Sequence, residues 1–230
     1  MRRAITLAAL VSVTLLSACG SDKQATEGTS MVKKIAAGAK ARIAARNGGG
    51  SPAAPADTQA MAASALKTVK GSILIAQFER TKFTTVLGQI GENAGIRTYA
   101  TPSEQAMLVK GGVVVGTRGF GDDLMSSSAD DAIRLIRSRS AGSVKRTYRY
   151  LDGEGIERPL PMTCTITPGA AQTLGAGTQG VQVVQVAESC VNGPLTVTNA
   201  YFVMGDGTIL VSHQWIGQTL GHADLQLVRP

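Results

Sequence analysis

The chain of 230 residues is poor in several residue types that mark common protein classes. Aromatic residues make up 4% of it, and it has two histidines and three cysteines. Basic residues without interleaved aromatic ones give no sign of nucleic-acid binding. Because the histidines and cysteines are few and none of them stands at the spacing of metal ligands, we predict no metal site. Beyond the leader, no apolar run approaches the roughly 20 residues of a membrane-spanning helix.

Sequence signatures of catalysis are also missing. No serine stands in a nucleophile elbow, and neither His213 nor His222 has an evident nucleophile as a partner. Residues 175–180 spell a dinucleotide-binding loop, but a strand pattern follows where that loop needs a helix. Residues 111–117 have the spacing of a phosphate loop without its lysine. We therefore predict no enzyme and no cofactor.

A leader opens the chain. A short basic stretch, Met1-Arg2-Arg3, precedes a mostly apolar run over residues 4–16, which is too short to cross a bilayer of roughly 30 Å. The following Leu16-Ser17-Ala18-Cys19 resembles a bacterial lipobox. The resemblance implies cleavage after residue 18 and diacylation of Cys19, with palmitate among the acyl chains, which anchors stably. Gly20 after the cysteine favours the outer membrane, on the side that faces the periplasm.

Composition divides the rest into a tether and a body. Residues 1–18 form the predicted signal peptide, and residues 19–57 a tether. Within the tether, residues 31–46 predict a basic helix, and a Gly/Pro-rich linker follows. The helix either approaches anionic lipid or an acidic polymer, or is a solvated helix. Residues 58–230 form the predicted domain, which starts with a short helix over 58–70.

Strand patterns follow one another from residue 71. Turn residues at 110–112, 152–153 and 206–207 predict three hairpins. One helix interrupts the strands, with residues 128–131 as its capping box. Because no alternation of strands and helices indicates a parallel sheet, we predict an all-β fold. It is an antiparallel meander of about 10–12 strands, curled into a deformed or half-open barrel.

Two cysteines remain beyond the lipobox, Cys164 and Cys190. An exported chain meets an oxidising compartment, which favours a disulfide between them. The alternative is two reduced, buried thiols.

The segment Thr117–Leu124, TRGFGDDL, is unusual because two glycines flank Phe120 and two carboxylates follow. Asp122 and Asp123 together could act as acid and base on one bond. The alternative is a tight turn in which Arg118 pairs with an aspartate. His213, in an alternating strand, is a base or a hydrogen-bonded sheet histidine.

Four segments together resemble the GfcB/YjbF family of group 4 capsule polysaccharide lipoproteins. They are GGVVVGTRGFGDDL (111–124), YRYLDGEG (148–155), AESC (187–190) and NAYFVMGDGTILVSHQWIG (199–217). The resemblance implies an all-β envelope lipoprotein that acts in production or export of capsule or exopolysaccharide, without a catalytic mechanism. It suggests one functional surface, made of Arg118, Asp122, Asp123, His213 and Trp215.

We thus predict a non-enzymatic accessory protein that binds polysaccharide-export proteins or an acidic polysaccharide. Trp215 would stack on a sugar ring, and Arg118 would pair with an acidic sugar. Three alternatives stay open: a carrier that holds a lipid in a half-barrel, a glycan-modifying enzyme, and a structural envelope protein.

Overall fold

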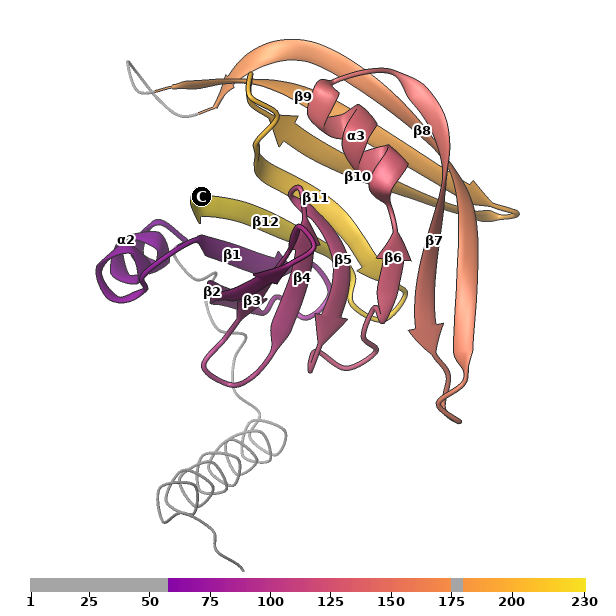
Figure 1. Ribbon diagram of the computed structural model, residues 1–230, viewed down its shortest axis with the longest axis horizontal. Coiled ribbons are helices and arrows are strands. Elements are labelled where there is room, and N and C mark those ends of the chain that lie inside the picture. The colour runs from indigo at the N-terminus through magenta and orange to yellow at the C-terminus, as the bar shows by residue number, and fades with distance from the viewer. Residues whose placement is uncertain (1–57, 175–179) are drawn as a thin grey trace, which may run out of the picture. The chain divides into compact units, whose positions relative to one another are not determined.

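The computed structural model describes residues 58–174 and 180–230 (Figure 1). The chain divides into two units, residues 1–52 and 53–230, and the described residues belong to the second. The predicted leader, the predicted lipidation site Cys19, the predicted tether and its predicted basic helix over 31–46 lie outside the described residues. Residues 175–179 of the glycine-rich stretch lie outside them as well.

One antiparallel sheet of 12 strands makes up the domain, in the order β5-β4-β3-β2-β1-β12-β11-β10-β9-β8-β7-β6. Consecutive strands are neighbours in the sheet with one exception, β5 and β6, and β1 pairs with β12. The two edge strands, β5 and β6, follow each other along the chain, so the sheet curls into a barrel with one seam (Figure 1). The predicted all-β, antiparallel, half-open barrel is confirmed.

The strands range in length from three residues in β6 to 18 in β8, and two short helices accompany them. The helices are α2 (Thr58–Thr68) and α3 (Asp130–Ser138). The strands are β1 (Ile73–Phe78), β2 (Thr84–Asn93), β3 (Ile96–Ala100), β4 (Ala106–Lys110), β5 (Val113–Arg118), β6 (Ser126–Ser128), β7 (Gly142–Leu151), β8 (Glu157–Leu174), β9 (Val181–Asn192), β10 (Leu195–Val203), β11 (Ile209–Gly217) and β12 (Gly221–Arg229).

The three predicted hairpins are confirmed as β4–β5, β7–β8 and β10–β11. Gly112 in the first has φ of +89°, and a Cβ there would lie 2.8 Å from the Cβ of Ile209. Only glycine fits this left-handed and crowded position. In the second, Asp152 Oδ1 accepts hydrogen bonds from the backbone N–H groups of Glu154 and Ile156, at 3.1 and 2.8 Å.

Helix α3 forms as expected, but its predicted capping box is wrong. The N-cap is Ala129, and no side chain caps the helix. Ser128 is the last residue of β6, and its hydroxyl accepts a hydrogen bond from Arg149 at 2.8 Å. Ser128 therefore pairs in the sheet and does not cap the helix as the local pattern had predicted. The negative charges of Asp130 and Asp131 in the first turn still interact favourably with the helix dipole.

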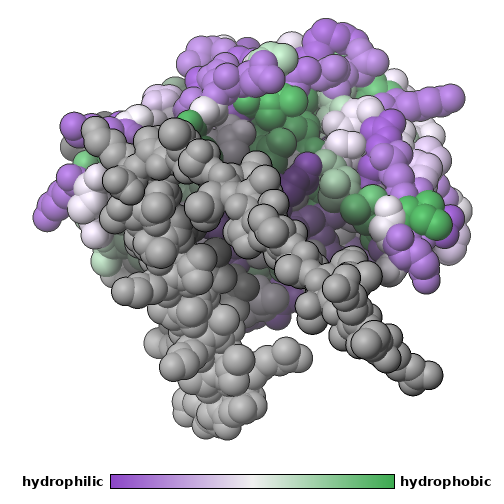
Figure 2. All heavy atoms as spheres, turned by 60° about the horizontal axis from the view of Figure 1, so that its bottom comes forward, coloured by the Kyte–Doolittle hydropathy of each residue, from purple (hydrophilic) through white to green (hydrophobic). Residues whose placement is uncertain are grey.

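The core has two parts. The larger lies inside the barrel and contains Leu87, Tyr148, Trp215 and Ile216. The second lies beneath α3, whose buried face packs on the concave side of the sheet (Figure 1). In Figure 2 the coloured part of the face is mostly hydrophilic, and hydrophobic residues show at its upper centre and at its right. Helix α3 thus covers part of the concave side of the sheet.

Candidate functional site

The TRGFGDDL segment folds into the loop between β5 and β6. The carboxylate of Asp123 accepts hydrogen bonds from Thr117 Oγ1 at 2.8 Å, Gly119 N at 2.7 Å and Phe120 N at 3.2 Å. Phe120 packs on Phe78, with ring centroids 4.7 Å apart. The hydrogen bonds of Asp123 therefore stabilise the conformation of the loop.

Arg118 and Asp122 hold the same loop to its surroundings. The Arg118 guanidinium donates to the carbonyl oxygens of Thr117 at 2.5 Å, Leu124 at 3.1 Å and Met125 at 3.1 Å. It bonds carbonyls, so the predicted pairing with an aspartate is not found. Asp122 accepts a short hydrogen bond from Thr219 Oγ1 in the β11–β12 turn. The two carboxylates have separate partners, so the geometry does not join them as an acid–base pair.

Trp215 lies in the barrel interior. It is 6% exposed, and its ring meets Tyr148 and Tyr150 edge-on, with centroids 5.2 and 6.2 Å apart. Its backbone N–H donates to Asn199 Oδ1 at 2.7 Å. The indole therefore has no exposed face for a sugar ring. The five residues of the predicted surface do not come together as one patch.

Gln214, in the SHQW segment, closes the barrel seam. Its Oε1 accepts from Val114 N at 2.9 Å, and its Nε2 donates to the carbonyl oxygen of Gly112 at 2.9 Å. The β5 edge, which has no neighbouring strand here, is thus paired by a side chain from β11. Further along, Thr117 N donates to Leu124 O at 2.8 Å. An open edge would otherwise expose unpaired backbone groups.

A buried ion pair spans the barrel beside this seam. Arg146 of β7 donates to Glu188 Oε2 of β9 at 2.9 Å, and their side chains are 2% and 0% exposed. The same oxygen accepts from Asn199 Nδ2 and Tyr201 Oη, both at 2.8 Å. Arg146 also donates to Val114 O at 3.3 Å. The sequence analysis missed this network.

The network shifts the pKa values of its members. Burial raises the pKa of Tyr148 to about 12 and that of Tyr201 well above its usual value. Burial alone would lower the pKa of Arg146, but the facing Tyr148 and Glu188 outweigh it and raise that pKa overall. Arg146 is therefore a permanent buried cation, and the tyrosines stay neutral.

Cys164 of β8 and Cys190 of β9 form the predicted disulfide, with an S–S distance of 2.03 Å. They are directly opposite each other across the two strands. The disulfide lies in the interior cluster that also contains Tyr148 and Trp215.

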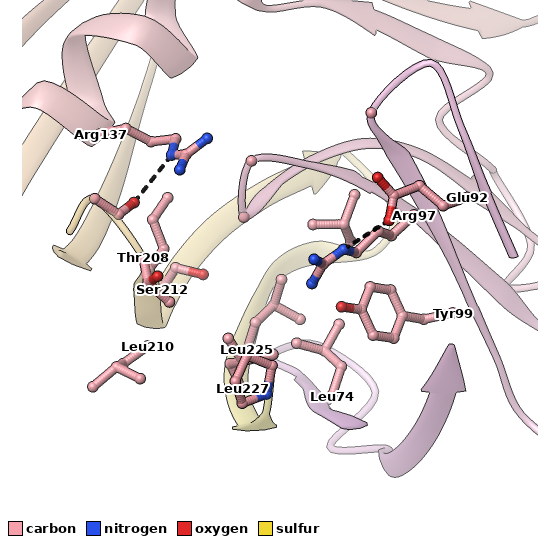
Figure 3. A pocket seen from close by; sticks show the side chains of 17 residues that line it. Leu74, Glu92, Arg97, Tyr99, Arg137, Thr208, Leu210, Ser212, Leu225 and Leu227 are labelled. Carbon is pink, nitrogen blue, oxygen red and sulfur yellow. Dashed lines mark hydrogen bonds and ion pairs between the residues drawn. The ribbon is translucent and has the colours of Figure 1, made fainter. Parts of the chain in front are cut away.

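A cavity with a volume of about 330 Å³ opens at the end of the barrel where α3 lies. Its apolar wall is made of Leu74, Val109, Leu225 and Leu227 (Figure 3). The β4–β5 and β10–β11 turns contribute to its rim. Drug-sized ligands occupy cavities of roughly 300 Å³ and more.

Two arginines carry positive charge at this cavity. Arg97 of β3 bonds Glu92 Oε2 at 3.2 Å, and Arg137 of α3 donates through Nε to Gly207 O at 3.1 Å. Figure 3 shows their guanidinium groups reaching into the cavity region from opposite sides. The neighbouring Tyr99 raises the pKa of Arg97 against the effect of burial, with Glu92 contributing. The arrangement places two donors for an anion above an apolar wall.

The strand pattern contains a signal for this cavity that the sequence analysis did not use. In a meander, every second turn lies at the same end of the sheet. The β2–β3, β4–β5 and β10–β11 turns therefore lie at one end, together with the Arg137 end of α3. The hairpin pattern is therefore enough to place three turns at this end of the sheet, those at residues 94–95, 111–112 and 204–208.

The two histidines form a separate cluster on β11 and β12. Their rings stack with centroids 4.1 Å apart and an interplanar angle of 10°. His213 Nδ1 lies 2.7 Å from Asp224 Oδ1. His222 Nδ1 lies 3.2 Å from Glu79 Oε2, and its Nε2 lies 2.9 Å from Thr198 O. His213 is thus the hydrogen-bonded sheet histidine that one of the two readings predicted.

Neither helix in the described part of the chain is long and apolar enough to cross a membrane.

Residues 32–228 match the model of the family described as group 4 capsule polysaccharide lipoprotein GfcB, YjbF. No curated protein matches the sequence. The crystal structure of the hypothetical lipoprotein YmcC from Escherichia coli K12 is similar, with 12% identity and a TM-score of 0.62 over 79% of this chain and 98% of that one. A protein of Bacteroides fragilis with a YmcC-like fold has 10% identity and a TM-score of 0.26, over 70% and 96%. The YmcC likeness shows the fold.

Proposed function

Because the chain belongs to the family of group 4 capsule polysaccharide lipoproteins (GfcB, YjbF), we propose that it is a non-enzymatic accessory protein in the production or export of capsule or exopolysaccharide. The lipid on Cys19 anchors it in the outer membrane, where the barrel faces the periplasm. The lipobox and the family match over residues 32–228 support this placement.

The barrel-end cavity is the part of the domain that binds the polymer. The observation that carries this proposal is the pair Arg97 and Arg137 above a wall of leucine and valine side chains. A guanidinium binds the carboxylate of an acidic sugar through charged hydrogen bonds. The C–H faces of the sugar ring pack on the apolar wall. The polymer partner is therefore an acidic polysaccharide.

Catalysis is not part of the proposal because the carboxylates of the TRGFGDDL loop have structural partners. Asp123 accepts three hydrogen bonds within its own loop, and Asp122 bonds Thr219. Glycosidases need two carboxylic groups that face one bond across a few ångströms.

A binding measurement tests the cavity. Full-length protein in detergent is titrated with an acidic oligosaccharide and with a neutral one of equal length. We expect binding of the acidic oligosaccharide alone, weakened at least tenfold in the Arg97→Ala/Arg137→Ala variant. Arg134→Ala is the matched control, because Arg134 lies on the exposed side of α3 and pairs with Asp131. Equal affinities for both oligosaccharides, or an unchanged double variant, would refute the site.

The second candidate is a carrier of a hydrophobic ligand, favoured by the apolar wall of Leu74, Val109, Leu225 and Leu227. Native mass spectrometry of the protein decides between the two. A lipid that copurifies at one equivalent, in addition to the acyl chains on Cys19, and that the acidic oligosaccharide does not displace would establish the carrier instead.

A further inference from the structure

The histidine cluster holds the only two histidines of the chain. They come from β11 and β12 and lie beside Glu79, which follows β1 directly. The backbone N–H of Glu79 donates to the carbonyl oxygen of His222 at 2.8 Å. The cluster therefore brings together the first strand along the chain, β1, and the last two, β11 and β12.

Hydrogen bonds fix which ring nitrogens can bind a cation. The Thr198 carbonyl accepts from His222 Nε2, so Nδ1 of a neutral ring directs its lone pair at Glu79 Oε2, 3.2 Å away. Two acceptors that face each other need a proton or a metal ion between them. The Asp224 carboxylate takes the Nδ1 hydrogen of His213, which leaves Nε2 with a lone pair. Metal-binding histidines are held in this way by a carbonyl or a carboxylate.

The three donor groups also come close enough together. One ligand atom from each of Glu79, His213 and His222 lies within 4.8 Å of the others. Donors on a tetrahedral zinc ion, with bonds of about 2.0–2.1 Å, are about 3.4 Å apart. The Glu79 side chain is 52% exposed and that of His213 39%, so both can turn, and rotation of the His213 ring out of its stack on His222 brings the donors together.

We propose that Glu79, His213 and His222 bind a divalent transition-metal ion, best matched by Zn²⁺. Two imidazoles and one carboxylate suit zinc, whereas magnesium and calcium prefer sites made of oxygen alone. Asp224 and the Thr198 carbonyl orient the rings.

The ion links the first strand of the barrel to its last two strands. β1 and β12 are about 150 residues apart in the sequence and pair with each other. Closing so long a loop is entropically unfavourable. A metal bonded to β11, β12 and the residue after β1 acts as a clip at this closure. The sequence shows no ligand spacing because positions 79, 213 and 222 meet only when these strands pair.

The test uses full-length protein in detergent, without a histidine tag and after treatment with a chelator. Zn²⁺ is titrated calorimetrically, and Co²⁺ is titrated in the visible range, where a tetrahedral site gives a characteristic spectrum. We expect one equivalent of Zn²⁺ and a melting temperature that rises with zinc. His213→Ala, His222→Ala and Glu79→Gln should each weaken binding at least tenfold. Asp224→Asn should weaken it severalfold.

Asp131→Asn is the control, since it removes one exposed carboxylate elsewhere and should bind zinc like the wild type. Circular dichroism verifies that each variant is folded. Absence of stoichiometric zinc binding by the wild type would overturn the proposal. So would three ligand variants that bind zinc with wild-type affinity, because the ion would then occupy other residues.

Discussion

Arg146 and Glu188 place opposite charges inside the barrel, where neither can be replaced alone without cost. Glu188→Gln leaves the Arg146 cation buried without a counter-charge. Removing one partner of a buried pair costs about 3–5 kcal/mol. We expect urea denaturation to show a loss of this size.

The matched control is Glu157→Gln, which removes the carboxylate of the exposed Arg149–Glu157 pair. Exposed pairs contribute about 1 kcal/mol or less. Similar losses in the two variants would show that the interior pair contributes no more to stability than an exposed pair.

The tyrosines in this network make the protein sensitive to alkali. Tyr148 ionises near pH 10 when unfolded and near pH 12 when folded. Between these values the unfolded state releases a proton that the folded state keeps, so the free energy of unfolding falls as pH rises. Two pKa units correspond to about 3 kcal/mol.

Tyr148→Phe should therefore lose less stability than the wild type between pH 10 and 12, measured by urea denaturation at each pH. Parallel curves for the two proteins would contradict the raised pKa of Tyr148. At the residue scale the sequence could not reveal this network. An arginine and a glutamate 42 positions apart lie within alternating strands, and only the register of β7, β8 and β9 brings them together.

At the scale of elements, the seam between β5 and β6 depends on one side chain. Gln214→Ala leaves Val114 N and Gly112 O without their partner. Each unsatisfied buried group costs about 1–3 kcal/mol. We expect faster hydrogen exchange along β5, measured at Val114, and a lower melting temperature.

Gln185→Ala serves as the control for the seam, because Gln185 is exposed on β9 and its side chain bonds only Gln172 among the described residues. If both variants exchange alike at Val114, Gln214 does not close the seam.

The elements show where local pattern is sufficient and where it is not. Turn residues predicted the β4–β5, β7–β8 and β10–β11 hairpins because glycine and aspartate conformations are determined locally. The predicted cap of α3 was wrong because Ser128 pairs in the sheet.

Trp215, in the SHQW segment, was assigned to a surface. An irregular register of β11 against β12 begins there, and the ring lies in the interior. Strand alternation does not predict such irregularities.

For the whole molecule, the disulfide limits the freedom of the unfolded chain. Cys164 and Cys190 are 26 residues apart, and closing such a loop contributes about 3 kcal/mol in the chain-entropy model. A reducing agent should lower the urea midpoint of the wild type to that of the Cys164→Ala/Cys190→Ala variant. It should not affect that variant. An unchanged wild-type midpoint, with reduction verified by thiol labelling, would contradict this contribution.

The cavity, too, belongs to the whole molecule. Arg97 and Arg137 come from β3 and α3, which are separated in the sequence and face each other only after the sheet curls. The sequence therefore predicted the barrel and the family, but not the residues that line the cavity at the end of the barrel.

Polysaccharide export in complemented deletion strains tests the central proposal most directly. The gene is deleted and restored as wild type, Cys19→Ser, Arg97→Ala/Arg137→Ala or the control Arg134→Ala, with protein levels verified by blot. Exported and cell-retained polysaccharide are then measured. The account predicts that the wild type and Arg134→Ala restore export, whereas the other two do not. Normal export in the deletion strain, under conditions where polymer is made, would contradict it.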